Sequence, residues 1–333
     1  MKRIIAVDLA KGICIILVVV GHYLPLNSPG WYGVLNDLIY SFHMPLFLFA
    51  SGYIYMETKR DEKYGTFIFR KIKRLMIPYF SLSLVIVTIK LLSLKVAAVQ
   101  AHISWNSYLE ILYKPSAAAF FWFIWVLFII FLIIPLFKTK TSRLLFFMAS
   151  IVFESLYITL PPVFCLNELK QSLLFFLLGV VIVDQDRLRE AALKTPAFLG
   201  YGLFLGLFFL GMYLKESVIY EKEWYSVLIL KSLPYLGIFS ICKLSISISH
   251  LKISSKFWLL LVAANSFIIY LYHTSFMGFA KAVLQKIPSL FETQNQLVFS
   301  AIALTIISIG VFCPILLNIW LIQKNKVLRF LFG

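Results

Sequence analysis

Charged side chains are scarce in this chain of 333 residues: Asp, Glu, Lys and Arg together make up only 14%. A soluble globular domain carries about 25%. Hydrophobic residues reach 61%, and a single soluble core, which stops growing at about 250–300 residues, cannot bury that excess. The lack of charge therefore excludes a soluble enzyme and a disordered chain, and it leaves a polytopic membrane protein.

Negatively charged residues are fewer than positively charged ones: the chain has 15 Asp and Glu against 31 Lys and Arg, which gives a net charge of +16. In a soluble chain this excess would indicate a nucleic-acid partner. In a membrane protein it is expected without one, because cytoplasmic loops collect Lys and Arg. We therefore expect the lipid bilayer as a partner and no nucleic acid.

Cysteine is almost absent: the chain has 4, and Cys14, Cys165, Cys242 and Cys313 lie far apart. This spacing excludes a disulfide scaffold and any cysteine-based metal or redox motif, so no metal site is predicted. The sequence also lacks an internal repeat, a low-complexity linker and room for a soluble segment. Residues 1–333 are therefore expected to form a single membrane domain.

Long apolar segments dominate the chain instead, and about 20 such residues cross the hydrocarbon layer as a helix. Asp8 and Lys11 interrupt the first segment and no small-residue cleavage site follows it, which favours a retained helix over a signal peptide. The predicted fold is all-α, with about ten transmembrane helices, at 4–24, 34–56, 75–95, 117–137, 143–160, 168–184, 196–214, 224–244, 257–280 and 297–321.

Lys and Arg are spread unevenly between the loops. If the N-terminus is cytoplasmic, the inside segments hold about three times as many of these residues as the outside segments, which is the bias expected of cytoplasmic loops. Both termini are therefore expected in the cytoplasm.

The first span carries three ionisable residues, and such residues are functional candidates because a charge at the bilayer centre costs at least about 2.5–3.5 kcal/mol. Asp8, Lys11 and His22 share approximately one helix face. Lys11 and His22 are separated by roughly 16 Å along a helix. The three can line one path across the membrane, or they can simply anchor the two helix ends.

The second span contains Pro45, which removes a helical hydrogen bond shortly after His43, and Gly52 adds a second weak point. Interrupted backbone at membrane depth is tolerated only against protein or a watery cavity. His43 is therefore a candidate for lining a cavity. The alternative is a kinked helix in which His43 bonds to a neighbouring helix.

Residues 59–74 are expected to form a strongly basic loop that ends in Arg70-Lys71-Ile72-Lys73-Arg74. The preference of cytoplasmic loops for cations explains part of this run, and binding of anionic lipid headgroups explains more. Four cations in five residues can also hold the phosphates of a cytoplasmic ligand.

Together these residues resemble acyltransferase family 3, the integral membrane O-acyltransferases that include the fucose O-acetylase-like branch. The segment from Asp8 to His22 is similar to the family's first-helix signature, in which a basic residue precedes a histidine by eleven positions. Further similarities lie in Phe42-His43-Met44-Pro45-Leu46-Phe47 with Ser51-Gly52-Tyr53, in Phe69–Arg74 before Pro78-Tyr79, in Trp122-Phe123, and in Asn265-Ser266 with Tyr270 and His273.

The resemblance implies transfer of an acyl group, commonly acetyl, from cytoplasmic acyl-coenzyme A, a co-substrate rather than a tightly bound cofactor. The implied acceptor is a hydroxyl of a cell-envelope or exported glycan or of a lipid-linked saccharide. The implied location is the plasma (inner) membrane of a bacterium. The family usually has arginine where Lys11 stands, and its paired arginines three positions apart appear here as Lys71 and Arg74.

The resemblance also implies catalytic roles for Asp8, Lys11, His22 and His43. A sugar hydroxyl is a poor nucleophile, so neutral His22 is expected to accept its proton as a general base. Another group must hold the oxyanion of the tetrahedral intermediate, and His43 and Ser51 both remain open for that role. Donor and substrate contacts are expected from Arg70, Lys71, Lys73, Arg74, Ser51, Trp122, Asn265, Tyr270 and His273.

Two other classes of protein compete with an acyltransferase. A transporter or exporter of polysaccharide or lipid-linked sugar could use the same polar path. Transporters often show related halves with matching broken helices, whereas the breaks here concentrate in the second span. A sensor or structural membrane protein would have no use for a path from Lys11 to His22.

Overall fold

The computed structural model describes residues 5–25, 28–93, 103–215, 224–286 and 295–333. All regular structure in these residues is helical. Within them, eight helices are long and apolar enough to cross a membrane, and they cover Gly30–Glu57, Tyr64–Leu92, Ala119–Leu136, Leu166–Asp184, Ala197–Leu214, Val227–Ser249, Ser266–Leu284 and Gln296–Ile322. These helices confirm a polytopic all-α membrane protein.

Several of the ten expected spans differ from the helices that form, and 34–56 is divided into α2 (Gly30–Tyr40) and α3 (His43–Glu57). The expected span 4–24 is α1 (Ile5–Gly21), of 17 residues, and the expected span 143–160 is α8 (Lys140–Ser155), of 16 residues. Helix α8 stops early because Leu156 is extended and two prolines, Pro161 and Pro162, follow it.

The expected span 257–280 is wrong as a single helix. It is divided into α13 (Ile253–Ala264) and α14 (Ser266–Leu284), with Asn265 between them at φ −102° and ψ 11°. The Asn265 side chain donates a hydrogen bond to the carbonyl of Leu261 at 2.9 Å. An asparagine that bonds to nearby backbone competes with the helical ladder, which accounts for a break at this residue.

The chain forms two compact units, residues 1–54 with 185–316 (unit 1) and residues 55–184 with 317–333 (unit 2). Unit 1 contains α1, α2 (Gly30–Tyr40), most of α3 (His43–Glu57), α10 (Asp186–Lys194), α11 (Ala197–Lys215), α12 (Trp224–Ser249), α13, α14 and most of α16 (Gln296–Leu317).

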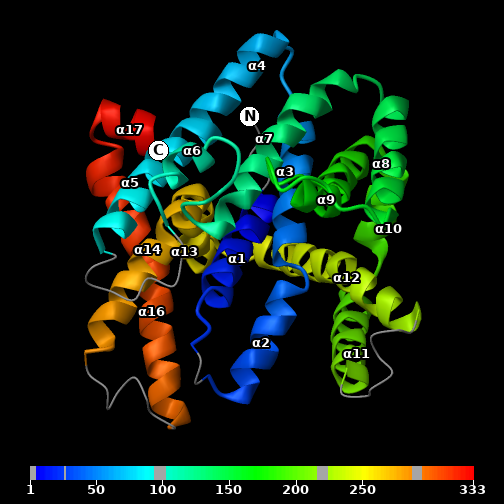
Figure 1. Cartoon of the computed structure of the whole chain (residues 1–333). Coiled ribbons are helices and arrows are strands. Elements are labelled where there is room, and N and C mark those ends of the chain that lie inside the picture. Colours follow the sequence, from blue (N-terminus) through cyan, green and yellow to red (C-terminus); the bar gives the residue numbers. More distant parts are fainter. Residues whose placement is uncertain (1–4, 26–27, 94–102, 216–223, 287–294) are drawn as a thin grey trace. The chain divides into compact units, whose positions relative to one another are not determined.

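Helix α1 lies in the interior of unit 1, where it packs against α2, α12, α13 and α14 (Figure 1). Its side chains Leu9, Ile15, Val18 and Val19 are fully buried. Gly12 permits the close approach of α13, because a Cβ atom there would lie 2.7 Å from the Leu259 carbonyl oxygen. A buried central helix of this kind gives fixed positions to any side chain at its ends.

Unit 2 contains the remaining helices. These are α4 (Tyr64–Lys71), the π-helical turn η1 (Ile72–Met76), α5 (Ile77–Ser93), α6 (Ser107–Glu110), η2 (Ala119–Phe121), α7 (Trp122–Ile133), η3 (Ile134–Leu136), α8, α9 (Leu166–Asp184), η5 (Asn318–Ile322) and α17 (Lys326–Phe332). Helix α9 packs against both α7 and α8, and α17 packs against α5. The core of unit 2 is rich in aromatic rings, including Phe121, Phe131 and Phe176.

The membrane orientation stays a prediction, and it can be tested with fused reporters. We expect reporters after Lys63 and Lys138 to be cytoplasmic and reporters near Asn27, Asn106 and Tyr220 to be external, because the Lys and Arg distribution favours that orientation. Asn27 and Tyr220 lie outside the described residues. An external signal from residues 59–74 would contradict both this topology and any cytoplasmic role for the basic run.

Candidate active site

Three histidines and a tyrosine gather in unit 1. The ring of His22, just after α1, lies 4.9 Å from the ring of His273 in α14, centroid to centroid, in an edge-to-face contact at 80°. Tyr40, the last residue of α2, lies 4.8 Å from the ring of His43, the first residue of α3. Tyr40 also lies 6.5 Å from His22. We call these four residues the histidine cluster.

The end of α1 is held by two side chains of α2. Tyr32 donates to the carbonyl of Val20 at 3.1 Å, and the buried amide of Asn36 donates to the carbonyl of Gly21 at 2.8 Å. The last carbonyls of a helix have no partner within it, so these bonds satisfy groups that would otherwise lack one. His22 directly follows Val20 and Gly21, so these bonds fix its backbone against α2.

All three histidines bond to backbone in the same way. The Nδ1 atoms of His22 and His43 lie 2.8 Å and 2.9 Å from the carbonyls of Val18 and Ile39, each four residues earlier, and Nδ1 of His273 lies 3.0 Å from that of Ile269. A carbonyl only accepts, so each Nδ1 carries the proton in this arrangement. In the neutral ring Nε2 then carries the lone pair. Each histidine is thus set up to accept a proton at Nε2.

The break lies before His43, at Ser41 and Phe42, and not at Pro45 itself. Helix α2 ends at Tyr40, Ser41 and Phe42 form a turn, and α3 begins at His43. Pro45 therefore sits in the first turn of α3, where the N–H groups have no intrahelical partner and its missing donor costs little. His43 begins the second helix rather than ending the first, and its carbonyl accepts a hydrogen bond from the Cys14 thiol of α1 at 3.0 Å.

Other residues singled out in unit 1 lie at different distances from the cluster. Tyr270 is buried one turn before His273, with ring centroids 6.4 Å apart. Asn265 occupies the break before α14, two turns from His273. The Ser51 hydroxyl, on α3, donates to the carbonyl of Phe47 at 2.8 Å.

Asp8 and Lys11 are half-buried on α1, well away from His22. Because α1 is continuous from Ile5 to Gly21, roughly 16 Å separates Lys11 from His22 along the helix axis. The structure therefore does not bring Asp8 and Lys11 into the histidine cluster. They lie at the opposite end of the same helix.

The basic run of residues 70–74 is helical, so the expectation of a loop there is wrong. The run occupies the end of α4 and the π-helical turn η1, which continues into α5. A π-helical turn is rare and frequently marks a functional position. The backbone groups of the run bond to one another instead of lying open as a loop would leave them.

The four cations of this run have different surroundings. The guanidinium of Arg70 forms an ion pair with Glu62. The Lys71 ammonium lies over the ring of Phe131, 3.5 Å from its centroid. Lys73 and Arg74 are exposed. The Lys73 ammonium also lies over an aromatic ring, 4.4 Å from the centroid of Phe69, so both lysines place their charge on an aromatic face.

Trp122, half-buried, begins α7 in unit 2.

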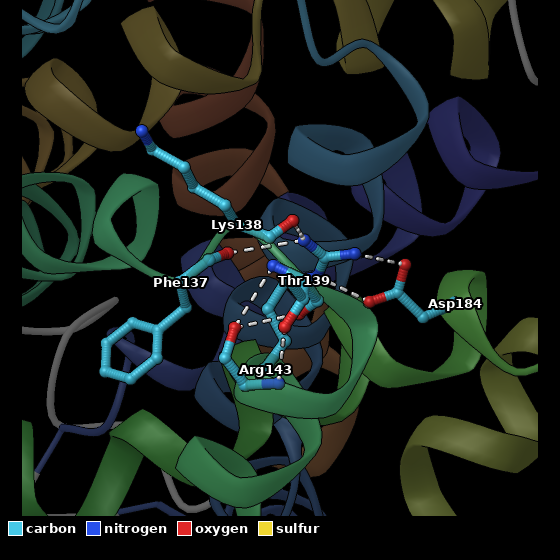
Figure 2. A network of polar contacts seen from close by, with 6 residues as sticks. Phe137, Lys138, Thr139, Arg143 and Asp184 are labelled. Atoms are coloured by element: carbon cyan, nitrogen blue, oxygen red, sulfur yellow. Dashed lines mark hydrogen bonds and ion pairs between the residues drawn. The ribbon is translucent and has the colours of Figure 1, made fainter.

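Unit 2 also holds a buried ion pair that the sequence did not indicate. Arg143, near the start of α8, donates two hydrogen bonds, of 2.5 Å and 2.8 Å, to the carboxylate of Asp184, the last residue of α9 (Figure 2). Arg143 donates further to the carbonyls of Lys138 at 2.7 Å and Phe137 at 3.3 Å. One guanidinium thus joins the chain before α8 to the end of α9.

Within the described ranges, no group of three or more His, Cys, Asp or Glu is placed to hold a metal ion. The side chains of the histidine cluster can themselves transfer protons and form hydrogen bonds. A cluster of proton-accepting rings is suited to activating a hydroxyl group as a nucleophile.

Comparison with known proteins gives two matches. The sequence pattern of a family described as an acyltransferase domain matches residues 4–319. Nodulation protein NolL of Sinorhizobium fredii (strain NBRC 101917 / NGR234) is 31% identical over 184 residues, which cover 50% of this chain and 49% of that protein. The match thus spans about half the length of that relative. No solved structure matches the chain.

Proposed function

Since this chain belongs to acyltransferase family 3 along almost its whole length, we propose that it moves an acyl group, commonly acetyl, from cytoplasmic acyl-coenzyme A to a hydroxyl of a cell-envelope or exported glycan. Family membership makes the protein a membrane acyltransferase rather than a transporter. The donor, the acceptor and a bacterial inner-membrane location are the proposed parts. A bacterial relative supports that location.

The observation that carries the proposal is the arrangement of His22. Its Nδ1 bond to the Val18 carbonyl leaves Nε2 as the proton acceptor of the neutral ring. The bonds from Tyr32 and Asn36 fix the chain end from which it projects. In the proposed reaction the acceptor hydroxyl attacks the thioester carbonyl while His22 takes the hydroxyl proton. The same proton then passes to the sulfur of coenzyme A as the carbon–sulfur bond breaks.

His273 is proposed to orient His22 rather than to act as a second base. Its ring stands at 80° to that of His22, so edge-to-face contact restricts rotation of the His22 ring. Tyr270 packs beside His273 from the same helix. This arrangement supports a role for the late residues Tyr270 and His273 in positioning the base.

The direct test uses inside-out membrane vesicles that contain the protein. Acyl-coenzyme A labelled in its acetyl group is supplied from the cytoplasmic face, and label is followed into glycan. We expect transfer with vesicles that carry the protein and none with matched vesicles that lack it. Equal labelling in both would contradict the proposed reaction.

We also propose that the basic run holds the phosphates of the donor. Arg74 is the clearest candidate because it is exposed, and a guanidinium pairs well with phosphate oxygens. Lys71 is proposed as its partner, although its ammonium lies over Phe131. Removing a charged hydrogen bond costs about 1.5–3 kcal/mol. We therefore expect Arg74→Ala to weaken coenzyme A binding by about tenfold to 150-fold.

Two further variants complete the donor experiment. Lys71→Met keeps an unbranched side chain on the Phe131 ring but removes the charge, so it separates a phosphate contact from simple packing. Lys140→Ala removes an exposed cation from α8 and is the matched control, for which we expect unchanged binding. Binding is measured on purified protein by calorimetry. If the Lys71→Met, Arg74→Ala double variant bound coenzyme A with wild-type affinity, the basic run would not contact the donor and would serve only to anchor the chain at the cytoplasmic surface.

A further inference from the structure

The proposed reaction needs a hydrogen-bond donor that neither sequence candidate supplies. As the hydroxyl attacks, the thioester carbonyl oxygen becomes an oxyanion, which a donor must stabilise. Ser51 directs its proton to the Phe47 carbonyl at 2.8 Å, and His43 directs its Nδ1 proton to the Ile39 carbonyl at 2.9 Å. A neutral histidine has no second proton to give. Both candidates are thus committed to backbone.

Tyr40 is the remaining side chain of the histidine cluster that carries a donor. Its ring makes an edge-to-face contact with His43 at 4.8 Å and lies tilted at 45° to His22, with centroids 6.5 Å apart. The residue is 50% exposed, so it is accessible to a bound molecule. A phenol keeps its proton at neutral pH, since its ordinary pKa is about 10.

The glycine before His22 makes room for this tyrosine. A Cβ atom at Gly21 would lie 3.0 Å from Cε2 of Tyr40, closer than side chains ordinarily pack. Gly21 also accepts the hydrogen bond from Asn36. The Gly21-His22 pair therefore does two things: it presents the proton acceptor, and it allows the Tyr40 ring to lie directly against the same turn.

We infer that Tyr40 is a further catalytic residue, whose hydroxyl donates a hydrogen bond to the thioester carbonyl oxygen in the transition state. This inference rests on the proposed function. The acceptor oxygen forms a bond to the carbonyl carbon, its proton goes to Nε2 of His22, and the carbonyl oxygen gains negative charge against the Tyr40 hydroxyl. When the carbonyl reforms, the carbon–sulfur bond breaks and the thiolate takes the proton from His22.

The decisive variant is Tyr40→Phe, which removes one oxygen and keeps the ring against Gly21 and His43. Loss of one oxyanion donor costs about 10²–10³ in kcat in a well-studied protease, and we expect a fall of that order. The KM for acyl-coenzyme A should stay within about twofold of wild type, because the bond strengthens only in the transition state.

The matched control is Tyr213→Phe, which removes a phenol oxygen from an exposed residue of α11 in the same unit and should leave kcat unchanged. Gly21→Ala provides a second line of evidence. It keeps the Tyr40 hydroxyl but displaces the ring, so we expect a fall in kcat of at least tenfold with coenzyme A binding intact.

The outcomes separate this inference from the function on which it rests. If wild-type vesicles transfer no acyl group, the proposed function fails. If wild type is active and Tyr40→Phe retains more than half of its kcat, the function stands and the role of Tyr40 is overturned. Coenzyme A binding is also measured on each purified variant. Wild-type binding shows that a lower rate does not result from misfolding.

Discussion

Replacing His22 by glutamine is expected to lower acyl transfer by about 10²–10⁴-fold, the usual contribution of a general base. Glutamine keeps approximate size and some hydrogen bonding, but it cannot take the proton of the acceptor hydroxyl. Expression and coenzyme A binding should stay near wild type. The wild-type rate should also fall as the pH is lowered, because a protonated imidazole has no lone pair at Nε2 to accept a further proton.

The matched control for His22→Gln is His250→Gln, which changes an exposed histidine just after α12 and should leave the rate unchanged. The measurement is initial rate of label transfer against pH in vesicles with equal amounts of protein. If His22→Gln kept most of the wild-type rate, His22 would be structural, and His43 would become the leading candidate for the base.

Removing one member of the buried Arg143–Asp184 pair is expected to destabilise the protein by about 3–5 kcal/mol, because the remaining charge loses its partner away from water. The two side chains are only 6% and 5% exposed. Arg143→Met also removes the bonds to the Phe137 and Lys138 carbonyls. The measurement is the free energy of unfolding of the purified protein in detergent.

A second pair in the same chain is the control for this prediction. Arg189 and Asp186 also form an ion pair, but they are 38% and 68% exposed, and exposed pairs contribute at most about 1 kcal/mol. Arg189→Met should therefore change stability little. The double variant Arg143→Met, Asp184→Leu should recover part of the loss, since it leaves no lone charge. Wild-type stability in Arg143→Met alone would mean that the pair contributes nothing.

The membrane helices were largely predictable, because a long apolar segment is a strong local signal. The difficulties arose where one polar residue decides the backbone. Asn265 divides the ninth expected span by bonding to Leu261, and hydropathy averaged over a window does not register a single side chain. The basic run was assigned to a loop for a related reason. Its charges lower the local hydropathy, although the chain is helical from Tyr64 into α5.

The candidate site was predictable in its residue types but not in its assembly. His22, His43 and His273 were all singled out, yet only the structure brings His273 of α14 against His22 of α1. Tyr40 was missed: it stands just before the second-helix motif that begins at Phe42, and the turn at Ser41 and Phe42 that brings its ring to His43 has no local sequence signal. Arg143 and Asp184 lie 41 positions apart, and no local pattern links residues at that separation.

The length of α1 has a consequence for the surrounding lipid. The 17 residues of α1 that the structure describes measure about 25 Å, against the roughly 30 Å of a typical hydrocarbon layer. With the N-terminus at the cytoplasmic surface, His22 would stop short of the outer headgroups. A short span is accommodated by local thinning of the bilayer, which would bring water and a polar acceptor down to the imidazole. Membrane thickness would then control access to the reaction, with short-chain lipids favouring it and long-chain lipids hindering it.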